Sequence, residues 1–512
     1  MTANYLINAL LAGKDDAAPF AEIPGTPTRH YTYGDVRDVS GRFAVRLMEL
    51  GVKPGDRVAV QVPKSIEALM LYLAVVRAGA IFLPLNTAYT AAEVAYFVGD
   101  AEPALVVCDP KDEAAIRPIA EKVGAKLETL GVWNAADNDA GTFLAGVSDA
   151  LTMETDVPRG PDDLAAILYT SGTTGRSKGA MLSHANLASN SETLVGHWGF
   201  TKDDVLIHAL PIYHTHGLFV ATNVTLIAGA SMIFLPKFDA KEAIALMPRA
   251  TSLMGVPTFY VRLIAEPGLG EASKSMRLFV SGSAPLLAET HDRFREITGK
   301  AILERYGMTE TNMNTSNPYD GDRRAGTVGF PLPGVELRVV EPESKEVKIL
   351  PQGEIGMIQV RGPNVFQGYW RMPEKTAEEL AADGWFTTGD LGKVDEDGYV
   401  HIVGRGKDLI ISGGFNVYPK EIESVIDELP GVDESAVIGV PHPDFGEGVV
   451  AVIVPRAGAS LDAASIESAL TDKLARFKQP KLIDFVDALP RNTMGKVQKN
   501  VLREKHAAAF KG

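Results

Sequence analysis

The chain has 512 residues, of which 46% are hydrophobic and 22% charged, and this length exceeds what a single hydrophobic core usually holds. We therefore expect at least two domains. The 50 Lys and Arg side chains against 65 Asp and Glu give a net charge of −15, which argues against nucleic acids and anionic membranes as partners. The single cysteine, Cys108, excludes an intramolecular disulfide and fits a reducing cytosol.

No segment of the sequence predicts a membrane span or an export signal. The N-terminal stretch MTANYLINALLAGKDDAAPF lacks a basic start and a clear cleavage site. The most apolar window, residues 66–85, contains Glu67 and Arg77 and is typical of a buried helix that runs into a strand. The C-terminal AAAFKG carries no peroxisomal signal, so we expect a cytoplasmic protein.

Helical and strand patterns alternate through the first part of the chain, as in a largely parallel sheet covered by helices. The helical patterns occupy residues 31–51, 65–80 and 91–102, and the strand patterns occupy residues 56–63, 81–86 and 104–109. Short apolar runs that end in Gly or Pro follow at residues 205–211, 230–236, 250–257 and 276–285.

The last third of the sequence has a different character. Residues 326–362 alternate apolar and polar side chains with many turn formers, which predicts an antiparallel sheet or barrel. Residues 418–474 are typical of a small α+β unit. Because glycines gather in residues 395–410, we predict an N-terminal domain of residues 1–404 and a C-terminal domain of residues 405–512.

A glycine-rich stretch, YTSGTTGRSKG at residues 169–179, lies between the strand pattern of residues 164–170 and a helical pattern at residues 180–190. Glycines let backbone N–H groups turn toward an anion, and a following helix N-terminus would add its dipole. The spacing of this stretch differs from the Walker pattern, because Lys178 is followed by Gly179. The stretch predicts a phosphate-binding loop of another kind, with a flexible surface loop as the alternative.

Four further stretches carry weaker signals. In ERYGMTETN, at residues 304–312, an aromatic ring precedes a glycine, and the carboxylate that follows suits Mg²⁺. In GWFTTGDLG, at residues 384–392, the aspartate suits a ribose, although an Asx turn is the plainer interpretation. The other two are GRGKDLIISGGFNVYPKEIE at residues 404–421 and PRNTMGKVQK at residues 490–499.

In this order the five stretches resemble the adenylate-forming superfamily, which includes acyl-CoA synthetases, luciferase-like enzymes and peptide-synthetase adenylation domains. The resemblance extends from about Tyr31 to Lys499. It implies an α/β fold whose large N-terminal domain combines mixed sheets, flanking helices and a β-rich subdomain. It also implies a small, mobile α+β C-terminal domain with its hinge near Lys407.

The resemblance implies ligands for ATP, Mg²⁺ and CoA. The ATP phosphates would be held by Thr170, Ser171, Gly172, Thr173, Thr174, Gly175 and Lys178. The adenine would be framed by Ser283, Ala284, Pro285 and Tyr306, and the ribose would be bound by Asp390 beside Arg405. The α-phosphate would contact Thr309, and Mg²⁺ would contact Glu310 and Thr170. Gly413 and Gly414 would line the tunnel for the pantetheine arm of CoA.

The implied reaction has two steps. A carboxylate attacks the α-phosphorus of ATP, which forms an acyl-adenylate and releases pyrophosphate; a thiol then attacks the acyl carbon, and AMP leaves. Lys496 matches the lysine that contacts the acid and the α-phosphate in the first step, where negative charge must be offset. A lysine acetyltransferase and a deacetylase acting on Lys496 would regulate this step.

The acid pocket is the part that the family pattern determines least. Relatives that use aromatic acids typically have glycine where this chain has Arg305. A buried arginine without a partner is costly, so a second carboxylate on the substrate would stabilise it. The alternative is that Arg305 points outward and pairs with an acid such as Glu304.

Other pocket residues follow from the same resemblance. They are His214 at the acyl tunnel, Thr215 and Met313 near the second carbon of the acid, and Arg262 as a further candidate for the distal carboxylate. His214 and His216 could also suggest a metal site, but no further Cys/His cluster in the sequence supports one.

The stretches PIYHTHGLF, MGVPTFYVRL and ERYGMTETNMNTSNP together resemble malonyl-CoA synthetases. The expected substrates are therefore malonate, and also methylmalonate, with ATP and CoA. The alternatives are another short- or medium-chain or aromatic acid, or a stand-alone adenylation enzyme that loads a separate carrier protein. A luciferase-like oxygenase is disfavoured by the charged pocket.

Overall fold

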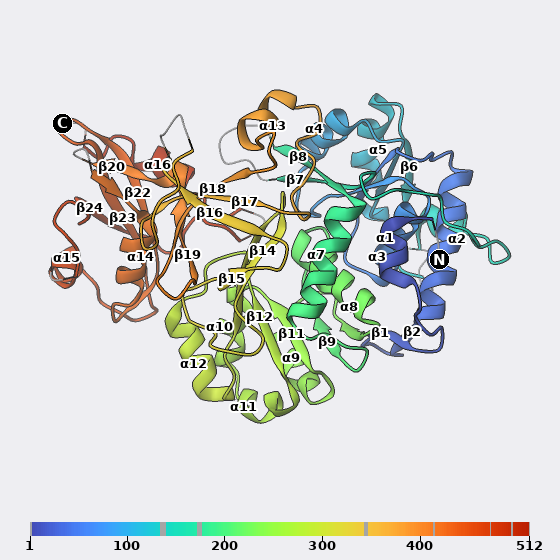
Figure 1. The fold of residues 1–512 in the computed structure, drawn as a ribbon, viewed down its shortest axis with the longest axis horizontal. Coiled ribbons are helices and arrows are strands. Elements are labelled where there is room, and N and C mark those ends of the chain that lie inside the picture. Colours follow the sequence, from blue (N-terminus) through green and yellow to red (C-terminus); the bar gives the residue numbers. More distant parts are fainter. Residues whose placement is uncertain are drawn as a thin grey trace. The chain divides into compact units, whose positions relative to one another are not determined.

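The computed structural model describes residues 3–133, 140–170, 177–342, 347–412, 415–471, 473–492 and 495–510. The chain divides into two compact units (Figure 1). Unit 1 comprises residues 1–325, 329–336 and 361–386, and unit 2 comprises residues 326–328, 337–360 and 387–512. None of the helices in the described part of the chain has the length and apolar composition that a bilayer span requires.

Unit 1 contains a nine-stranded sheet in the order β15-β14-β13-β12-β11-β9-β10-β1-β2. Its strands are β1 (Pro19–Ile23), β2 (Arg29–Thr32), β9 (Val205–His208), β10 (Ser231–Phe234), β11 (Ser252–Gly255), β12 (Leu278–Ser281), β13 (Leu303–Met308), β14 (Asn312–Ser316) and β15 (Phe330–Pro331). The central pairs from β1 to β13 are parallel, whereas β14 and β15 are antiparallel additions at one edge. The short apolar runs of the sequence are therefore confirmed as parallel strands.

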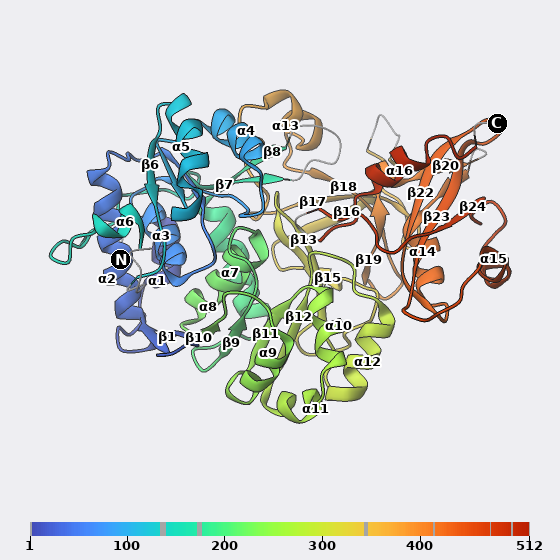
Figure 2. The ribbon, with the colours of Figure 1, turned by 180° about the vertical axis from the view of Figure 1, so that it is seen from behind.

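Helices cover this sheet and form its core. Leu253 and Phe279 on the strands pack with Tyr260, Leu263 and Phe294 on the helices. These residues come from α10 (Pro257–Ala265) and α12 (Ala288–Thr298), which lie side by side in Figure 2. The packing places the carboxyl ends of β12 and β13, and the segments that follow them, where a ligand site of an α/β protein is expected.

A second, six-stranded sheet of unit 1 runs in the order β6-β5-β3-β4-β7-β8. Its strands are β3 (Arg57–Gln61), β4 (Ile81–Pro84), β5 (Leu105–Cys108), β6 (Lys126–Thr129), β7 (Leu164–Thr170) and β8 (Lys178–Ser183). The alternating helices are α2 (Tyr33–Glu49), α3 (Ile66–Arg77) and α4 (Ala91–Ala101). Cys108 is fully buried on β5, where burial raises the pKa of its thiol to about 12, so it is an inert strand residue.

The apolar window that contains two charges is confirmed as a buried helix, α3. Its charges are neutralised locally, since Glu67 Oε1 lies 2.8 Å from Arg29 Nη1 and Arg77 Nε lies 2.5 Å from Asp156 Oδ1. Both charges are thus paired, as buried charges must be.

One prediction of local structure is wrong. The segment after the glycine-rich loop begins as strand β8 and becomes helix α7 (His184–His197) only after Ser183, which caps that helix. Strands β7 and β8 form an antiparallel pair in which Thr170 lies opposite Lys178. The loop therefore joins two strands of a hairpin, and no helix dipole follows it directly. The reason is tertiary: β8 pairs with β7 on one side, and Ala180 bridges to Tyr369 on the other.

Unit 2 is built around two sheets. A four-stranded sheet has the order β16 (Glu336–Val340), β17 (Gly356–Arg361), β18 (Phe386–Val394) and β19 (Val400–Arg405), and a few terminal residues of these strands belong to unit 1. The other sheet comprises β20 (Ile410–Ser412), β21 (Phe415–Val417), β22 (Val432–His442), β23 (Gly446–Pro455) and β24 (Leu482–Phe485). Its helices are α14 (Pro419–Asp427), α15 (Ala463–Thr471) and α16 (Lys499–His506).

The predicted fold class is confirmed: mixed α/β sheets are followed by a β-rich sheet and a small α+β region. Both sheets of the last region belong to one compact unit. A compact unit need not end at a hinge, so the boundary between residues 404 and 405 stays a prediction.

Strand β14 is held in place by buried amide side chains of unit 1. Asn190 on α7 donates from Nδ2 to the Met313 carbonyl at 2.8 Å and accepts from the Met313 N–H at 3.2 Å. Asn364 donates to the carbonyls of Thr311 and Met313. These bonds fix the strand that lies beside β13.

Asn190→Ala removes the side-chain acceptor of the Met313 N–H and one of two side-chain donors to the Met313 carbonyl, which keeps its hydrogen bond from Asn364. The unsatisfied N–H costs about 1–3 kcal/mol, so we expect the thermal midpoint to fall by about 1–4 °C in a unit of this size. Thermal unfolding followed by circular dichroism checks this result. Glu192→Ala, an exposed change on the same helix, is the control, and equal midpoints for the two variants would contradict the prediction.

Candidate active site

The glycine-rich loop begins and ends at two residues that the structure describes. Thr170 is the last residue of β7 and Lys178 the first of β8, and the two are register partners. The predicted phosphate ligands Ser171, Gly172, Thr173, Thr174 and Gly175 lie outside the described residues. The hairpin thus brings the hydroxyl of Thr170 and the ammonium of Lys178 to the same end of the sheet.

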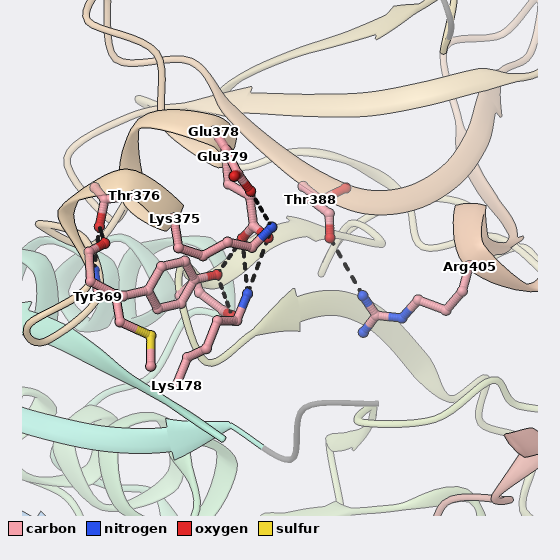
Figure 3. A network of polar contacts seen from close by, with 10 residues as sticks. Lys178, Tyr369, Lys375, Thr376, Glu378, Glu379, Thr388 and Arg405 are labelled. Carbon is pink, nitrogen blue, oxygen red and sulfur yellow. Dashed lines mark hydrogen bonds and ion pairs between the residues drawn. The ribbon is translucent and has the colours of Figure 1, made fainter. Parts of the chain in front are cut away.

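Lys178 belongs to a cluster of charged groups (Figure 3). Its Nζ lies 3.1 Å from both carboxylate oxygens of Glu379 and 4.1 Å from the centroid of the Tyr369 ring. The Tyr369 hydroxyl lies 2.5 Å from Glu379 Oε2 and 3.0 Å from Glu310 Oε1. Lys375, on the same helix α13 (Pro373–Glu379), also contacts Glu379. The sequence prediction included Lys178 and Glu310 and missed Tyr369 and Glu379.

The protonation states in this cluster follow from burial and charge. Burial and then the negative charges of Glu310 and Glu379 raise the pKa of Tyr369. Burial opposes ionisation of Glu379, but hydrogen bonds from Tyr369, Lys375 and Lys178 outweigh it and lower the pKa of this carboxyl. At neutral pH the phenol therefore keeps its proton and Glu379 is ionised.

Glu310 is the predicted metal ligand, and its surroundings suit a hard cation. The side chain is 6% exposed, and carboxylate oxygens are what Mg²⁺ prefers. Among the described residues no three His, Cys, Asp or Glu side chains gather as a metal site. A site with so few protein ligands is usual for Mg²⁺, which is commonly held by one or two carboxylates together with substrate phosphates.

Arg305 lies on β13 and is buried, with 3% of its surface exposed. Its Nε and Nη2 have no hydrogen-bond partner in the described part of the chain. Burial lowers the pKa of the guanidinium to about 9. The alternative that Arg305 points outward to Glu304 is therefore wrong; Glu304 instead accepts a hydrogen bond from the Leu286 N–H at 3.2 Å.

The backbone beneath Arg305 leaves room for its guanidinium. A Cβ at Gly282 would lie 2.4 Å from Arg305 Cζ, so a larger residue there would have to displace the guanidinium. The next residue, Ser283, has a φ of +71°, which a residue other than glycine rarely adopts. Strain of this kind is often found at functional sites, and Ser283 is a predicted nucleotide contact.

Two further buried polar side chains accompany Arg305. His216 is 2% exposed; its Nδ1 lies 3.3 Å from Ser283 Oγ, and its Nε2 has no partner within the described ranges. Burial, and then the charge of Arg305, hold the pKa of His216 well below its usual range, so the ring is neutral. Thr215 is 2% exposed, and its Oγ1 likewise lacks a partner among the described residues. Such groups are suited to the polar end of a small ligand.

The role of His214 at the acyl tunnel stays a prediction, and the structure adds His216 as a second, buried candidate. His214 is only partly buried, and its Nδ1 lies 3.4 Å from the His216 N–H. The H-x-H pattern was the available signal for a second histidine beside His214.

His216 begins a π-helix, η2 (His216–Thr222), and such turns are frequent at functional sites. Gly217 is required there, because a Cβ would lie 1.9 Å from the Pro211 carbonyl oxygen. His208 Nε2 lies 2.9 Å from the Gly217 carbonyl oxygen, and its Nδ1 lies 2.9 Å from Lys64 Nζ. This buried lysine–histidine pair supports the π-helix, and the sequence prediction missed it.

The remaining predicted pocket residues differ in their burial. Met313 is 2% exposed on β14 and packs against Gly307, where a Cβ would lie 2.7 Å from the Met313 methyl. Tyr306 and Thr309 are partly buried. Ala284 and Pro285 are exposed beside Ser283, and Arg262 is exposed on α10, so the structure does not bring Arg262 to Arg305.

Asn312 is a candidate that the sequence prediction missed. It is 1% exposed, has a φ of +50°, and neither of its side-chain amide atoms has a partner in the part of the chain that the structure describes. A strained, unsatisfied buried amide is unusual outside functional sites. No sequence pattern marks it, because its strain arises from the turn between β13 and β14.

Unit 2 carries the other predicted residues. Asp390 is 4% exposed, and its Oδ1 lies 2.9 Å from Arg405 Nε. The guanidinium of Arg405 also points to the Thr388 carbonyl oxygen, at 3.4 Å (Figure 3). This pairing fixes the orientation of the Asp390 carboxylate at the register position where β18 and β19 meet.

The two predicted lysines of unit 2, Lys407 and Lys496, are both exposed, as mobile catalytic cations would be. Lys407 is exposed in the single turn η5 (Gly406–Asp408). Lys496 is exposed in a loop where its N–H donates to Asn492 Oδ1 and its carbonyl accepts from the Asn492 N–H, both at 2.9 Å. Gly413 and Gly414 lie outside the described residues.

Comparison with known proteins shows which family the chain matches. Residues 12–370 match the family described as AMP-binding enzyme, and residues 421–496 match the AMP-binding enzyme C-terminal domain. A crystal structure of ATP-bound MatB from Rhodopseudomonas palustris is 61% identical, with 100% of both chains covered and a TM-score of 0.95.

Two further relatives have names that indicate different acid substrates. Malonate–CoA ligase from Arabidopsis thaliana is 35% identical over 89% of this chain and 78% of its own length. Feruloyl-CoA synthase from an Amycolatopsis species is 36% identical over 94% of this chain and 96% of its own.

Arg305→Met tests whether the buried charge is uncompensated in the unliganded protein. Replacing a buried ion by an apolar side chain of similar volume is neutral or stabilising by about 1–4 kcal/mol, so we expect an unchanged or higher thermal midpoint without ligand. The contrasting variant is Arg277→Met, because Arg277 forms two hydrogen bonds to buried Asp204 and its removal should lower the midpoint. Equal destabilisation by both changes would show that Arg305 already has a partner.

Proposed function

Because the chain belongs to the family of AMP-binding enzymes, we propose that it is an AMP-forming acid–thiol ligase that converts malonate, ATP and CoA to malonyl-CoA, AMP and pyrophosphate. Methylmalonate, which has the same two carboxylates, is a second expected substrate. The observation that carries the choice of acid is the buried guanidinium of Arg305, whose Nε and Nη2 have no partner in the described part of the chain.

Overall similarity does not choose the acid. A malonate ligase and a feruloyl ligase are 35% and 36% identical to this chain, so the pocket must discriminate. In an acid with one carboxylate, that carboxylate is consumed in the reaction, so Arg305 is left unpaired at a cost of several kcal/mol. A dicarboxylate reacts at one end and pairs with Arg305 at the other, with short charge-assisted hydrogen bonds.

The polar neighbours of Arg305 favour a short acid. The neutral ring of His216 and the hydroxyl of Thr215 are buried and unsatisfied in the described part of the chain, so a long apolar or aromatic acyl group would leave them without hydrogen bonds. A three-carbon diacid brings carboxylate oxygens to them instead. The pocket therefore supports malonate over ferulate.

In the proposed first step, the phosphates of ATP lie at the hairpin of β7 and β8. Lys178 contacts the β- and γ-phosphates, and Thr309 contacts the α-phosphate. Glu310 holds Mg²⁺, which when bound neutralises phosphate charge. Asp390, oriented by Arg405, accepts hydrogen bonds from the ribose hydroxyls. Lys496 offsets the charge that gathers on the α-phosphate as the malonate oxygen attacks.

In the proposed second step, the thiol of CoA attacks the acyl carbon and AMP leaves. The hinge near Lys407 exchanges Lys496 for the segment that contains Gly413 and Gly414. Lys496 is exposed in its loop, which suits the acetyltransferase and deacetylase proposed to act on it. Acetylation would remove its charge and slow the first step alone.

Arg305→Met should change the choice of acid. Thioester formation with ATP and CoA is measured for malonate, methylmalonate, succinate, acetate, butyrate and coumarate. We expect wild type to prefer malonate, and kcat/KM of the variant for malonate to fall by about 10²–10³ because the distal carboxylate loses its partner, with butyrate changed by no more than about threefold.

The control is Arg262→Met, an exposed arginine that should leave both acids unaffected. Equal losses for malonate and butyrate in Arg305→Met would contradict the proposed substrate. Adenylation without thioester formation from free CoA would favour an enzyme that loads a carrier protein.

Lys496→Ala should separate the two steps. Malonate-dependent exchange of pyrophosphate into ATP is expected to fall by about 10²–10³, the usual loss for one transition-state contact. Thioester formation from supplied malonyl-adenylate should stay within about threefold of wild type, because the lysine acts only in the first step. If both half-reactions fall together, this assignment of Lys496 is wrong.

A further inference from the structure

Lys178, the cation at the end of the phosphate loop, lies against an anion of its own chain. Both carboxylate oxygens of Glu379 are 3.1 Å from its Nζ. The two side chains are 20% and 23% exposed, so the pair is open to water and to ligands. A pair this accessible is weak enough to exchange partners.

Glu379 is the common acceptor of the cluster in Figure 3. It accepts hydrogen bonds from Lys178, Lys375 and the Tyr369 hydroxyl. A phenol has one proton, so Tyr369 can donate to only one of the two carboxylates beside it. The shorter distance, 2.5 Å to Glu379 against 3.0 Å to Glu310, assigns the proton to Glu379.

We propose that Glu379 is a positioning residue that competes with pyrophosphate for Lys178. It holds the ammonium while the phosphate site is empty, yields it to the phosphates of ATP, and takes it back as pyrophosphate leaves. The inference rests on the proposed function, in which Lys178 contacts the phosphates that become pyrophosphate. This competition would explain how a site that binds a polyanion also releases it.

The geometry supports exchange. The Lys178 ammonium lies 4.1 Å over the Tyr369 ring, which attracts a cation at many positions along its face. An ammonium on a flexible stem can therefore move from the carboxylate toward a phosphate without losing all of its contacts. Glu379 remains ionised throughout, because Lys375 on the same helix still neutralises it at 3.0 Å.

The test is Glu379→Gln in the full-length protein, with magnesium pyrophosphate binding measured by isothermal titration calorimetry. The amide keeps the size of the side chain and removes the charge that competes for Lys178. We expect pyrophosphate to bind about fivefold more tightly, the effect of a partly exposed ion pair, and pyrophosphate to inhibit more strongly against ATP. Unchanged or weaker binding would overturn the inference.

Two further variants make the test specific. Glu378→Gln changes the adjacent glutamate, which contacts Lys375, and should bind pyrophosphate as wild type does. In a Lys178→Met background, Glu379→Gln should have no effect, since the competition needs the lysine. A fivefold gain that persists without Lys178 would indicate general repulsion and overturn the proposal.

The outcome also separates this inference from the proposed function. If wild type binds neither ATP nor pyrophosphate, the proposed function fails. If it binds both and Glu379→Gln does not tighten pyrophosphate, only the role of Glu379 fails. Thermal unfolding shows whether the variants are folded, and a misfolded Glu379→Gln is replaced by Glu379→Met, for which the same result is expected.

Discussion

A buried positive charge in unit 1, whose Nε and Nη2 have no partner among the described residues, is the constraint on which the proposed site depends. Burial of the Arg305 guanidinium opposes its charge, and a buried charge is costly unless a counter-charge or hydrogen bonds compensate it. The surroundings are arranged around this charge: Gly282 leaves the space, and His216 is kept neutral by burial and by Arg305 itself. In the proposed function a dicarboxylate compensates this charge, which would link substrate choice directly to the cost of burying an ion.

The two ends of the site use charge in opposite ways. The cation of the proposed acid pocket, Arg305, is only 3% exposed, so pairing with a substrate carboxylate there would be strong and selective. The phosphate end has a lysine that is 20% exposed and already neutralised by Glu379, so binding there is weaker and reversible. One strand and its turn connect the two ends, because Arg305 lies on β13 and Glu310 follows in the turn after it. A ligase must discriminate its acid and release its pyrophosphate, and these two environments suit those tasks.

Features that depend on local sequence were predictable, and those that depend on tertiary pairing were not. The parallel strands, the buried helix α3 and the inward arginine follow from apolar runs and from a residue type at a fixed offset in a motif. The strand β8 was predicted as a helix, because its pairing with β7 and its bridge to Tyr369 involve distant residues. Glu379 lies 201 residues from Lys178, and Lys64 lies 144 residues from His208. No local sequence pattern connects such pairs. The positive φ of Asn312 is also not predictable from the sequence, because it arises from the turn between β13 and β14.

We propose that Arg305 binds the second carboxylate of the substrate. A crystal structure of the protein with malonyl-adenylate is the direct test, because the distal carboxylate is then free to choose its partner. Both carboxylate oxygens should lie about 2.7–2.9 Å from guanidinium nitrogens of Arg305, as in bidentate pairs. A distal carboxylate that faces solvent or pairs with another cation, while Arg305 stays unpaired, would contradict it.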